Sequence, residues 1–186
     1  MRDGWRQKVL PIGGDLELKG LGLTDEHKDI LLNEVNFVIN SAASVNFDDP
    51  ILESLNINYF GALRMFDIIE QSKSIIAMAH VSTAYVNSNR PGFIEEKIYP
   101  LRNGLEPEDY ISQILKLNPE QCAERKKDII GDYPNTYTFT KSCAERVLMK
   151  RIANGCPKNV AIIRPSIVCG TEKNPMMGWT ETLSAG

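Results

Sequence analysis

Apolar and polar positions divide the chain into two alternating kinds of segment. Short apolar runs rich in valine and isoleucine are separated by longer stretches in which apolar residues recur at helical spacing. The first pattern is typical of buried strands and the second of amphipathic helices. Their alternation predicts an α/β fold, in which a parallel sheet packs against helices.

Four apolar runs are predicted to be strands, and they cover residues 8–12, 35–40, 75–82 and 160–163. The middle two are apolar on both faces, as expected of strands inside a parallel sheet. The last run ends at Arg164-Pro165, because proline cannot continue the hydrogen-bonded ladder.

The longer stretches are predicted to be helices. One begins after the cap residue Thr24, and two longer ones cover about residues 49–71 and 135–154. Residues 99–133 are long for a connection, so we expect further helices around 107–117 and 119–130. The chain contains no repeat, and its length suits one domain.

Composition and charge restrict the classes of partner and site that this chain is expected to have. The formal net charge of the 186 residues is −3, which gives no reason to expect nucleic acid as a partner. The four cysteines lack C-x-x-C spacing and only two histidines are present, so we predict no metal site and a reducing compartment. No apolar run approaches the roughly 20 residues of a membrane span, so the chain is predicted to be soluble and cytoplasmic.

Small and hydroxyl-bearing residues follow the predicted strands. In a parallel α/β sheet, ligands bind beyond the carboxyl ends of the strands. These ends carry, in chain order, Asp15, then Ser41, Ala42 and Ala43, then Ser82 and Thr83, and finally Arg164, Pro165 and Ser166. Such residues leave room for a flat cofactor, so this edge is the predicted ligand site.

Tyr137 and Lys141 form the candidate catalytic pair. Being four residues apart, they share one face of the predicted helix, about 6 Å apart at Cβ. The spacing alone is a weak signal, because an exposed tyrosine beside a solvated lysine also fits it. In this position, however, the ammonium is expected to lower the pKa of the phenol, which then donates a proton to a substrate carbonyl. A hydroxyl from Ser82 or Thr83 can polarise the same oxygen, so that hydride adds to carbon.

Several segments around these residues resemble the fatty acyl-CoA reductase branch of the extended short-chain dehydrogenase/reductase family. The matching segments are PIGGDLELKGLGL (11–23), INSAASVNFDDPILESLNINYFGALRMFDI (39–68), HVSTAYVN (80–87), IEEKIYP (94–100), PNTYTFTKSCAE (134–145), IIRPSIV (162–168) and GW (178–179). They occur in register over nearly the whole chain. The resemblance implies a Rossmann-like, doubly wound parallel sheet with helices on both faces.

The resemblance also implies a role for each matching residue. Thr83 corresponds to the hydroxyl member of the catalytic triad, Tyr137 to the proton donor, and Lys141 to the residue that binds the nicotinamide ribose. The implied cofactor-binding residues are Asp15 and Leu16 near the adenine, Ser41, Ala42 and Ala43 along the cofactor, Tyr137 and Lys141, and Arg164, Pro165 and Ser166 beside the nicotinamide. Asn58 matches an asparagine that the family uses structurally.

In that family, NADPH reduces a long-chain fatty acyl-CoA to an aldehyde with loss of CoA, and a second hydride gives the primary alcohol. Two other functions stay open. One is that of another extended reductase, acting on a carrier-protein thioester or on a nucleotide sugar. The other is that of a non-catalytic regulatory or binding fragment.

Both ends of the sequence depart from the family pattern. The glycine-rich turn G-x-x-G-x-x-G belongs to a first βαβ unit that we do not find, and the family's C-terminal domain does not follow. We therefore interpret residues 1–186 as a partial NAD(P)-binding reductase domain and expect the chain alone to be inactive. The parent protein is expected on the endoplasmic reticulum or peroxisomal membrane, facing the cytosol, with membrane contact only through the missing C-terminal region.

Overall fold

The computed structural model describes residues 4–101, 104–156 and 158–180. Its centre is a parallel sheet in the order β1-β2-β3, formed by Phe37–Asn40, Ala77–Val81 and Asn159–Ile163. Phe37 pairs with Ala77, which in turn pairs with Asn159, so the three carboxyl ends lie at the same edge. The predicted α/β class is confirmed.

The predicted strand at residues 8–12 is wrong. Trp5–Lys8 form a short 3₁₀ helix, η1, and residues 9–12 have no regular structure. Val9 and Leu10 are exposed. Within the described part of the chain, no strand pairs with β1 on its outer side. The apolar run thus has strand-like composition without a neighbouring strand to supply hydrogen bonds.

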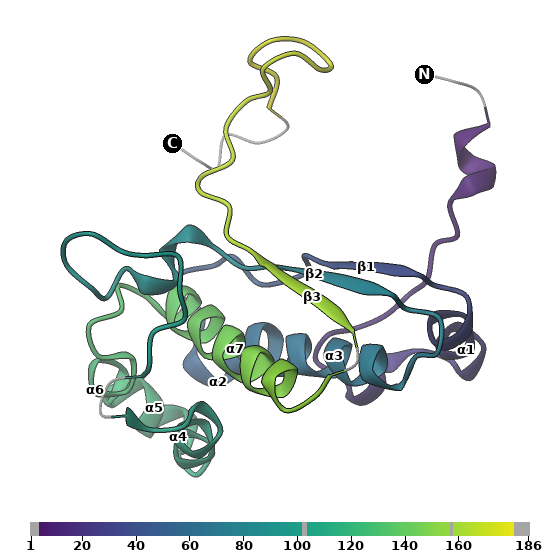
Figure 1. Cartoon of the computed structure of the whole chain (residues 1–186). Coiled ribbons are helices and arrows are strands. Elements are labelled where there is room, and N and C mark those ends of the chain that lie inside the picture. Colours follow the sequence, from purple (N-terminus) through teal and green to yellow (C-terminus); the bar gives the residue numbers. More distant parts are fainter. Residues whose placement is uncertain (1–3, 102–103, 157, 181–186) are drawn as a thin grey trace.

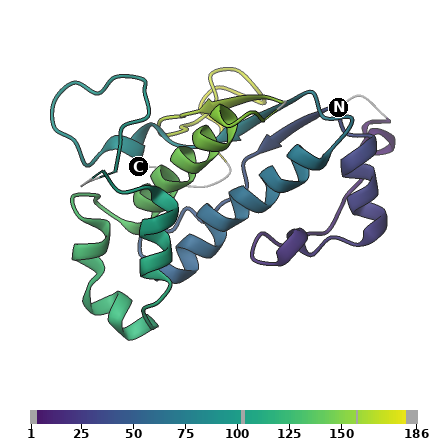
Figure 2. The same cartoon turned by 60° about the horizontal axis from the view of Figure 1, so that its bottom comes forward.

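The long helices form one layer against the sheet (Figure 1), and seen from that side they run roughly alongside one another (Figure 2). They are α1 (Asp25–Asn33), the continuous stretch of α2 (Ile51–Ser54), π-helical η3 (Leu55–Phe60) and α3 (Gly61–Gln71), and α7 (Thr136–Ala153). The predicted helices at these positions are confirmed. The Thr24 hydroxyl caps α1 by accepting a hydrogen bond from the His27 amide.

The remaining elements are short. They are η2 (Lys19–Gly22), η4 (Ala84–Asn87), α4 (Pro107–Ile114), α5 (Pro119–Glu124) and α6 (Lys126–Ile130). Helices α4 to α6 confirm the helices predicted between residues 99 and 133, and they gather beside the first half of α7 (Figure 1). No helix among the described residues has both the length and the apolar composition to cross a membrane.

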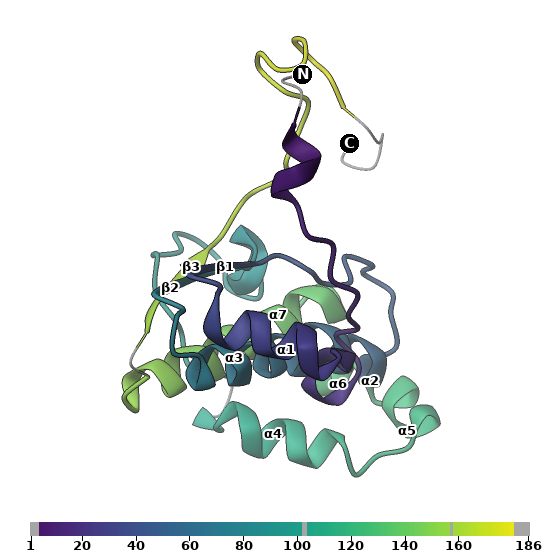
Figure 3. The same cartoon turned by 90° about the vertical axis from the view of Figure 1, so that its right-hand side faces the viewer.

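The two faces of the sheet differ in cover. On the helix side, Met78 packs in a buried cluster with Phe66, Ile69 and Leu148. On the other side, Phe37 and Ile39 are 69% and 75% exposed. Figure 3 shows the helices on one side of the sheet, with both ends of the described chain rising from the other. The predicted helices on the second face are therefore not found in the described ranges.

Candidate active site

The candidate site lies where the parallel strands end. The Ser82 amide donates to the Ile163 carbonyl at 2.7 Å, and the Ala84 amide donates to the Pro165 carbonyl at 2.9 Å. These bonds extend the contact between β2 and β3 beyond the regular ladder. As a result, the segment that carries Thr83 and the segment that carries Arg164 stay side by side.

Thr83 and Tyr137 meet at this edge. Thr83 is buried and caps η4, because its Oγ1 accepts a hydrogen bond from the Tyr85 amide. Tyr137 is half-buried in the first turn of α7. Burial raises the pKa of the Tyr137 phenol above its ordinary value, and a hydrogen bond with Thr83 partly offsets that rise. The expected lowering of this pKa is therefore wrong, because loss of solvation outweighs the effects that favour the phenolate.

Lys141 lies one turn further along α7 and is almost fully buried. The side chain is 3% exposed, and its Nζ donates to the Val81 carbonyl at 2.6 Å. Desolvation lowers the pKa of Lys141 to about 8, and the nearby Glu145 carboxylate opposes that change. The ammonium is thus fixed at the end of β2 and titrates unusually close to neutrality.

The loop after β1 holds the start of α7. The Thr136 hydroxyl bonds to the carbonyls of Phe47 and Asp49, at 3.1 and 3.0 Å. The Asn135 side chain caps the helix by accepting from the Thr138 amide at 2.9 Å. The Phe47 ring lies 5.6 Å from the Tyr137 ring, centre to centre. Together these contacts fix the position from which the phenol projects.

Asn58 fastens the same loop to the π-helical segment η3. Its Oδ1 accepts from the Ser44 amide at 2.9 Å, and its Nδ2 donates to the Ser44 carbonyl at 3.0 Å. The same Nδ2 lies 3.3 Å from the Thr140 hydroxyl of α7. Because both polar atoms of the Asn58 side chain form these hydrogen bonds, the structure agrees with a structural role for this residue.

The predicted cofactor segments at residues 15–16 and 41–43 are exposed or half-buried. Ser41 and Ala42 are exposed directly after β1, and Ala43 is half-buried. Asp15 is exposed, and its Oδ1 accepts from the Glu17 amide. Leu16 rests on the start of α3, where a Cβ at Gly61 would lie 3.0 Å from the Leu16 Cβ. A glycine at position 61 thus allows the close approach of this segment.

Arg164 turns its guanidinium toward α7. Its Nε and Nη2 bind the Glu145 carboxylate oxygens at 3.0 and 2.6 Å, and Nη2 also donates to the Lys97 carbonyl. The Pro165 carbonyl is bonded to Ala84, and Ser166 is exposed. Sequence reasoning missed Glu145, although the spacing that links Tyr137 to Lys141 continues by four more residues to Glu145.

His80 and Ser82 place polar atoms in the interior beneath the site. Neither the His80 Nε2 nor the Ser82 Oγ has a hydrogen-bond partner among the described residues. The His80 Nδ1 lies 3.2 Å from the Asn40 amide nitrogen, which pairs the ends of β1 and β2. Burial, together with the charge of Lys141, lowers the pKa of His80 to about 3. His80 is therefore neutral near physiological pH.

The donors at this edge suit a nicotinamide nucleotide. In the described ranges, the Lys141 ammonium donates to the Val81 carbonyl and to no second acceptor, so two of its N–H groups can bind ribose hydroxyls. The exposed backbone after β1 contributes small side chains that allow close approach. The residues therefore fit this class of cofactor.

A separate cavity of about 690 Å³ is lined in part by residues of α4, α6 and α7. Its walls include Asn89, Tyr110, Ile129 and Phe139. Phe139 comes two residues after Tyr137, and side chains at that spacing point to different faces of a helix. The described lining includes none of Thr83, Tyr137 and Lys141.

Comparisons with solved structures agree with the fold. A terminal R domain from the myxalamid PKS-NRPS biosynthetic pathway has a TM-score of 0.63 at 21% identity, over 92% of this chain and 37% of its own. The PhqB reductase domain from Penicillium fellutanum has a TM-score of 0.59 at 21% identity, over 98% and 38%. These similarities confirm the Rossmann-like α/β fold of the sheet and its helices.

Curated relatives are more similar in sequence. A putative fatty acyl-CoA reductase of Drosophila melanogaster, CG8306, is 38% identical over 93% of this chain and 32% of its own length. Fatty acyl-CoA reductase 1 of Rattus norvegicus is 32% identical over 97% and 34%, respectively. A probable fatty acyl-CoA reductase 5 of Arabidopsis thaliana is 34% identical over 95% and 40%. The chain thus spans about a third of the length of such relatives.

The family model that describes the NAD-binding male sterility proteins matches residues 2–186. The match includes every element of the described sheet and the whole candidate site. This chain belongs to the male sterility protein family.

Proposed function

We propose that this chain forms part of an NADPH-dependent fatty acyl-CoA reductase, which converts long-chain acyl-CoA to a primary alcohol through an aldehyde. The observation that carries the proposal is the meeting of Thr83, Tyr137 and Lys141 at the carboxyl edge of a parallel sheet. The fatty acyl-CoA reductases among the relatives support the choice of substrate. Membrane association of the parent protein stays a prediction.

The residues of this edge divide the chemistry between them. NADPH, when bound, supplies the hydride. Tyr137 donates its phenolic proton to the aldehyde oxygen as that oxygen gains negative charge, and Thr83 holds the phenol in place. Lys141 offers its free N–H groups to the ribose and places a positive charge one turn from the phenol. In the first reduction, hydride would add to the thioester carbon and the C–S bond would break, so that CoA leaves as a thiolate and takes up a proton from water.

The raised pKa of Tyr137 fits the role of an acid. A phenol that holds its proton near neutrality is present in the form that donates. Reprotonation must follow each turnover, since the alcohol leaves with the transferred proton. Tyr137 is only half-buried, so water can reach its side chain and supply the new proton.

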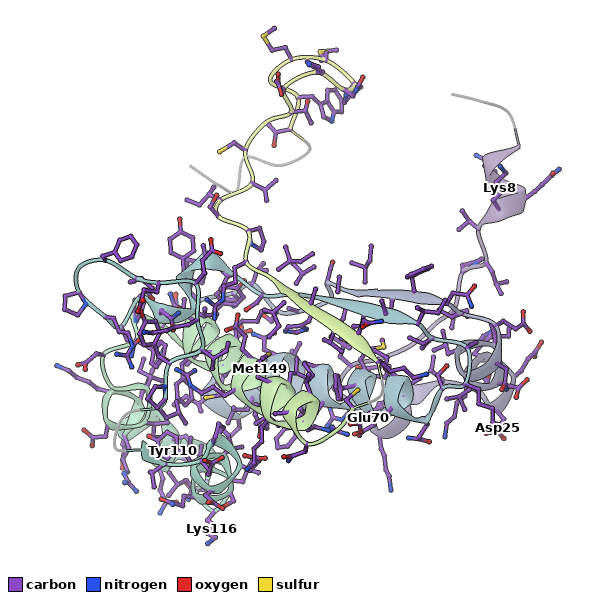
Figure 4. The ribbon with its side chains drawn as sticks, in the orientation of Figure 1. Lys8, Asp25, Glu70, Tyr110, Lys116 and Met149 are labelled. Atoms are coloured by element: carbon purple, nitrogen blue, oxygen red, sulfur yellow. The ribbon has the colours of Figure 1, made fainter. Side chains whose placement is uncertain are left out.

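The test is an assay of the full-length protein that carries this chain. NADPH consumption and fatty alcohol are measured with a long-chain acyl-CoA, for the wild type and for Tyr137→Phe. We expect the variant to retain NADPH binding and to lose roughly 10²- to 10⁴-fold in the rate of aldehyde reduction. Tyr110→Phe is the control, because that phenol bonds to the Ile129 carbonyl in the helices beside α7 (Figure 4).

Two results would count against the proposal. Full activity in Tyr137→Phe would remove the assigned proton donor. A wild type that binds NADPH but reduces only a carrier-protein thioester or a nucleotide sugar would keep the site and change the substrate. The 186-residue chain assayed alone tests the separate expectation that it is inactive.

A further inference from the structure

Tyr137, Lys141 and Glu145 form a continuous polar stripe along the buried side of α7. They are spaced by four residues, so they follow one another on the same face of the helix. Each is connected to a different part of the sheet edge: Tyr137 to Thr83, Lys141 to the Val81 carbonyl, and Glu145 to Arg164 beyond β3. The third connection has no part in the proposed chemistry, yet it belongs to the same stripe.

Glu145 is a carboxylate in the protein interior. It is 2% exposed, and both of its oxygens accept from Arg164, at 3.0 and 2.6 Å. Charges are rarely buried to this extent unless they are paired. Arg164 therefore provides the paired charge for a carboxylate that lies one helical turn from Lys141.

The Lys141 ammonium needs such a neighbour. Its burial favours the neutral amine, and its one bond to the protein within the described ranges goes to an uncharged carbonyl. Among its interactions, the charge of Glu145 favours the ammonium, whereas desolvation opposes it. An uncharged Lys141 would present a lone pair in place of one N–H donor.

We propose that Glu145 is a positioning residue of this site: fixed by Arg164, its buried carboxylate keeps the Lys141 side chain charged and docked at the end of β2. The inference rests on the proposed function only for the role of Lys141 in catalysis. It also gives Arg164 a function other than direct contact of its guanidinium with the cofactor.

The other charged groups near Lys141 are not expected to titrate in the pH range in which Lys141 does. His80 on β2 interacts with Lys141 but has its pKa lowered to about 3, and the pKa of Tyr137 on α7 is raised. The pKa of Arg164 is raised by its pairing with Glu145, and Glu96 acts on it in the same direction. Within this cluster, Lys141 is therefore the group expected to titrate between pH 7 and 9.

The test follows the Lys141 Cε resonance against pH by NMR in the 186-residue chain, with Lys141→Arg to assign the signal. We expect Glu145→Gln to move the midpoint down by about one pH unit, because a nearby opposite charge stabilises the ammonium by at least that amount. Glu70→Gln is the matched control. It removes a carboxylate near the end of α3 that pairs with Arg151 near the end of α7 (Figure 4), and it should leave the Lys141 midpoint unchanged.

An unchanged Lys141 midpoint in folded Glu145→Gln would overturn the proposal and leave the ion pair as a structural tie. Should that variant fail to fold, Glu145→Asp keeps the charge on a shorter side chain. It should lower the midpoint by a smaller amount, and no change there would equally overturn the proposal. The titration needs no substrate, so a shifted midpoint with no acyl-CoA reduction would reject the proposed function alone.

In the full-length protein, the same variant should shift the pH profile. The alkaline limb of the profile, which Lys141 deprotonation sets, should move to lower pH in Glu145→Gln, so this variant should lose activity at an alkaline pH where the wild type is still active. Glu145→Asp should restore part of that range. A uniform loss at every pH, without a shift of the profile, would indicate damage to the fold and contradict the positioning role.

Discussion

The two faces of the sheet carry similar residues in different surroundings. Phe37 on β1 is 69% exposed, whereas Phe66 of α3, packed against the covered face, is fully buried. Strands β1 to β3 alternate their side chains between these faces, so composition is not what separates them. What separates them is the layer of α1, α3 and α7 on one side (Figure 3).

The covered face also contains two buried groups whose pKa values are strongly lowered. His80 and Met78 point to the same side of β2, and Lys141 reaches that edge from α7. Side chains on the open face extend from the sheet, and the part of the chain that the structure describes places no second layer of helices over them (Figure 4). A helix layer thus creates both the hydrophobic core and the low-polarity surroundings of the candidate site.

Truncating one phenylalanine beside each face should give the largest contrast. Phe66→Ala leaves a cavity in the core and should cost about 3–5 kcal/mol of unfolding free energy. Phe37→Ala removes an exposed ring and should change stability by less than about 0.5 kcal/mol. Urea unfolding of the two variants measures both values. Similar losses would mean that the open face is also packed in solution.

Acid should destabilise the protein through His80. Its pKa is about 3 in the folded state against an ordinary 6.5, so the unfolded chain binds the extra proton between these values. Stability therefore falls as pH decreases from 6.5 toward 3, by on the order of 4 kcal/mol. His80→Gln should flatten this part of the profile, measured by urea unfolding at several pH values. His27→Gln in α1 is the control, and an equal flattening there would contradict the assignment.

Mild alkali should act in the opposite direction through Lys141. The pKa is about 8 in the folded state against an ordinary 10.5, so between these values the unfolded chain binds more protons. Stability contributed by this group rises with pH over that range, by on the order of 3 kcal/mol. Lys141→Met should remove the rise. Lys116→Met, a charge removed from the exposed end of α4 (Figure 4), should retain it.

Local sequence signals predicted most of the fold. The strand predicted at 75–82 corresponds to β2, and the helix predicted at 135–154 corresponds to α7. Both patterns were informative because they reflect which side chains are buried between the sheet and the helices. The run at 8–12 failed because a strand needs a neighbour, and no described strand lies beside it. The described residues include no helix over Phe37 and Ile39, and the sequence could not predict this, because an apolar strand does not reveal what covers it.

The candidate site was predictable in its members but less so in its electrostatics. The spacing of Tyr137 and Lys141 and the strand end at Thr83 placed the three together. The direction of the Tyr137 pKa could not be obtained from spacing, because the depth of burial decided it. Glu145 and Arg164 are 19 residues apart and meet only through the packing of α7 on β3.

The smallest free-energy change is expected from a charge on the open face. Ile39 is 75% exposed on β1, so Ile39→Lys should alter the unfolding free energy by less than about 0.5 kcal/mol. It should nevertheless raise the concentration at which the chain self-associates, because a lysine disfavours pairing at an exposed apolar edge. Light scattering over a concentration series measures this. Leu115→Lys, at an exposed position after α4, is the control for added charge. An equal gain from both substitutions would show that the loss of any exposed apolar side chain, and not cover of this face of the sheet, governs association.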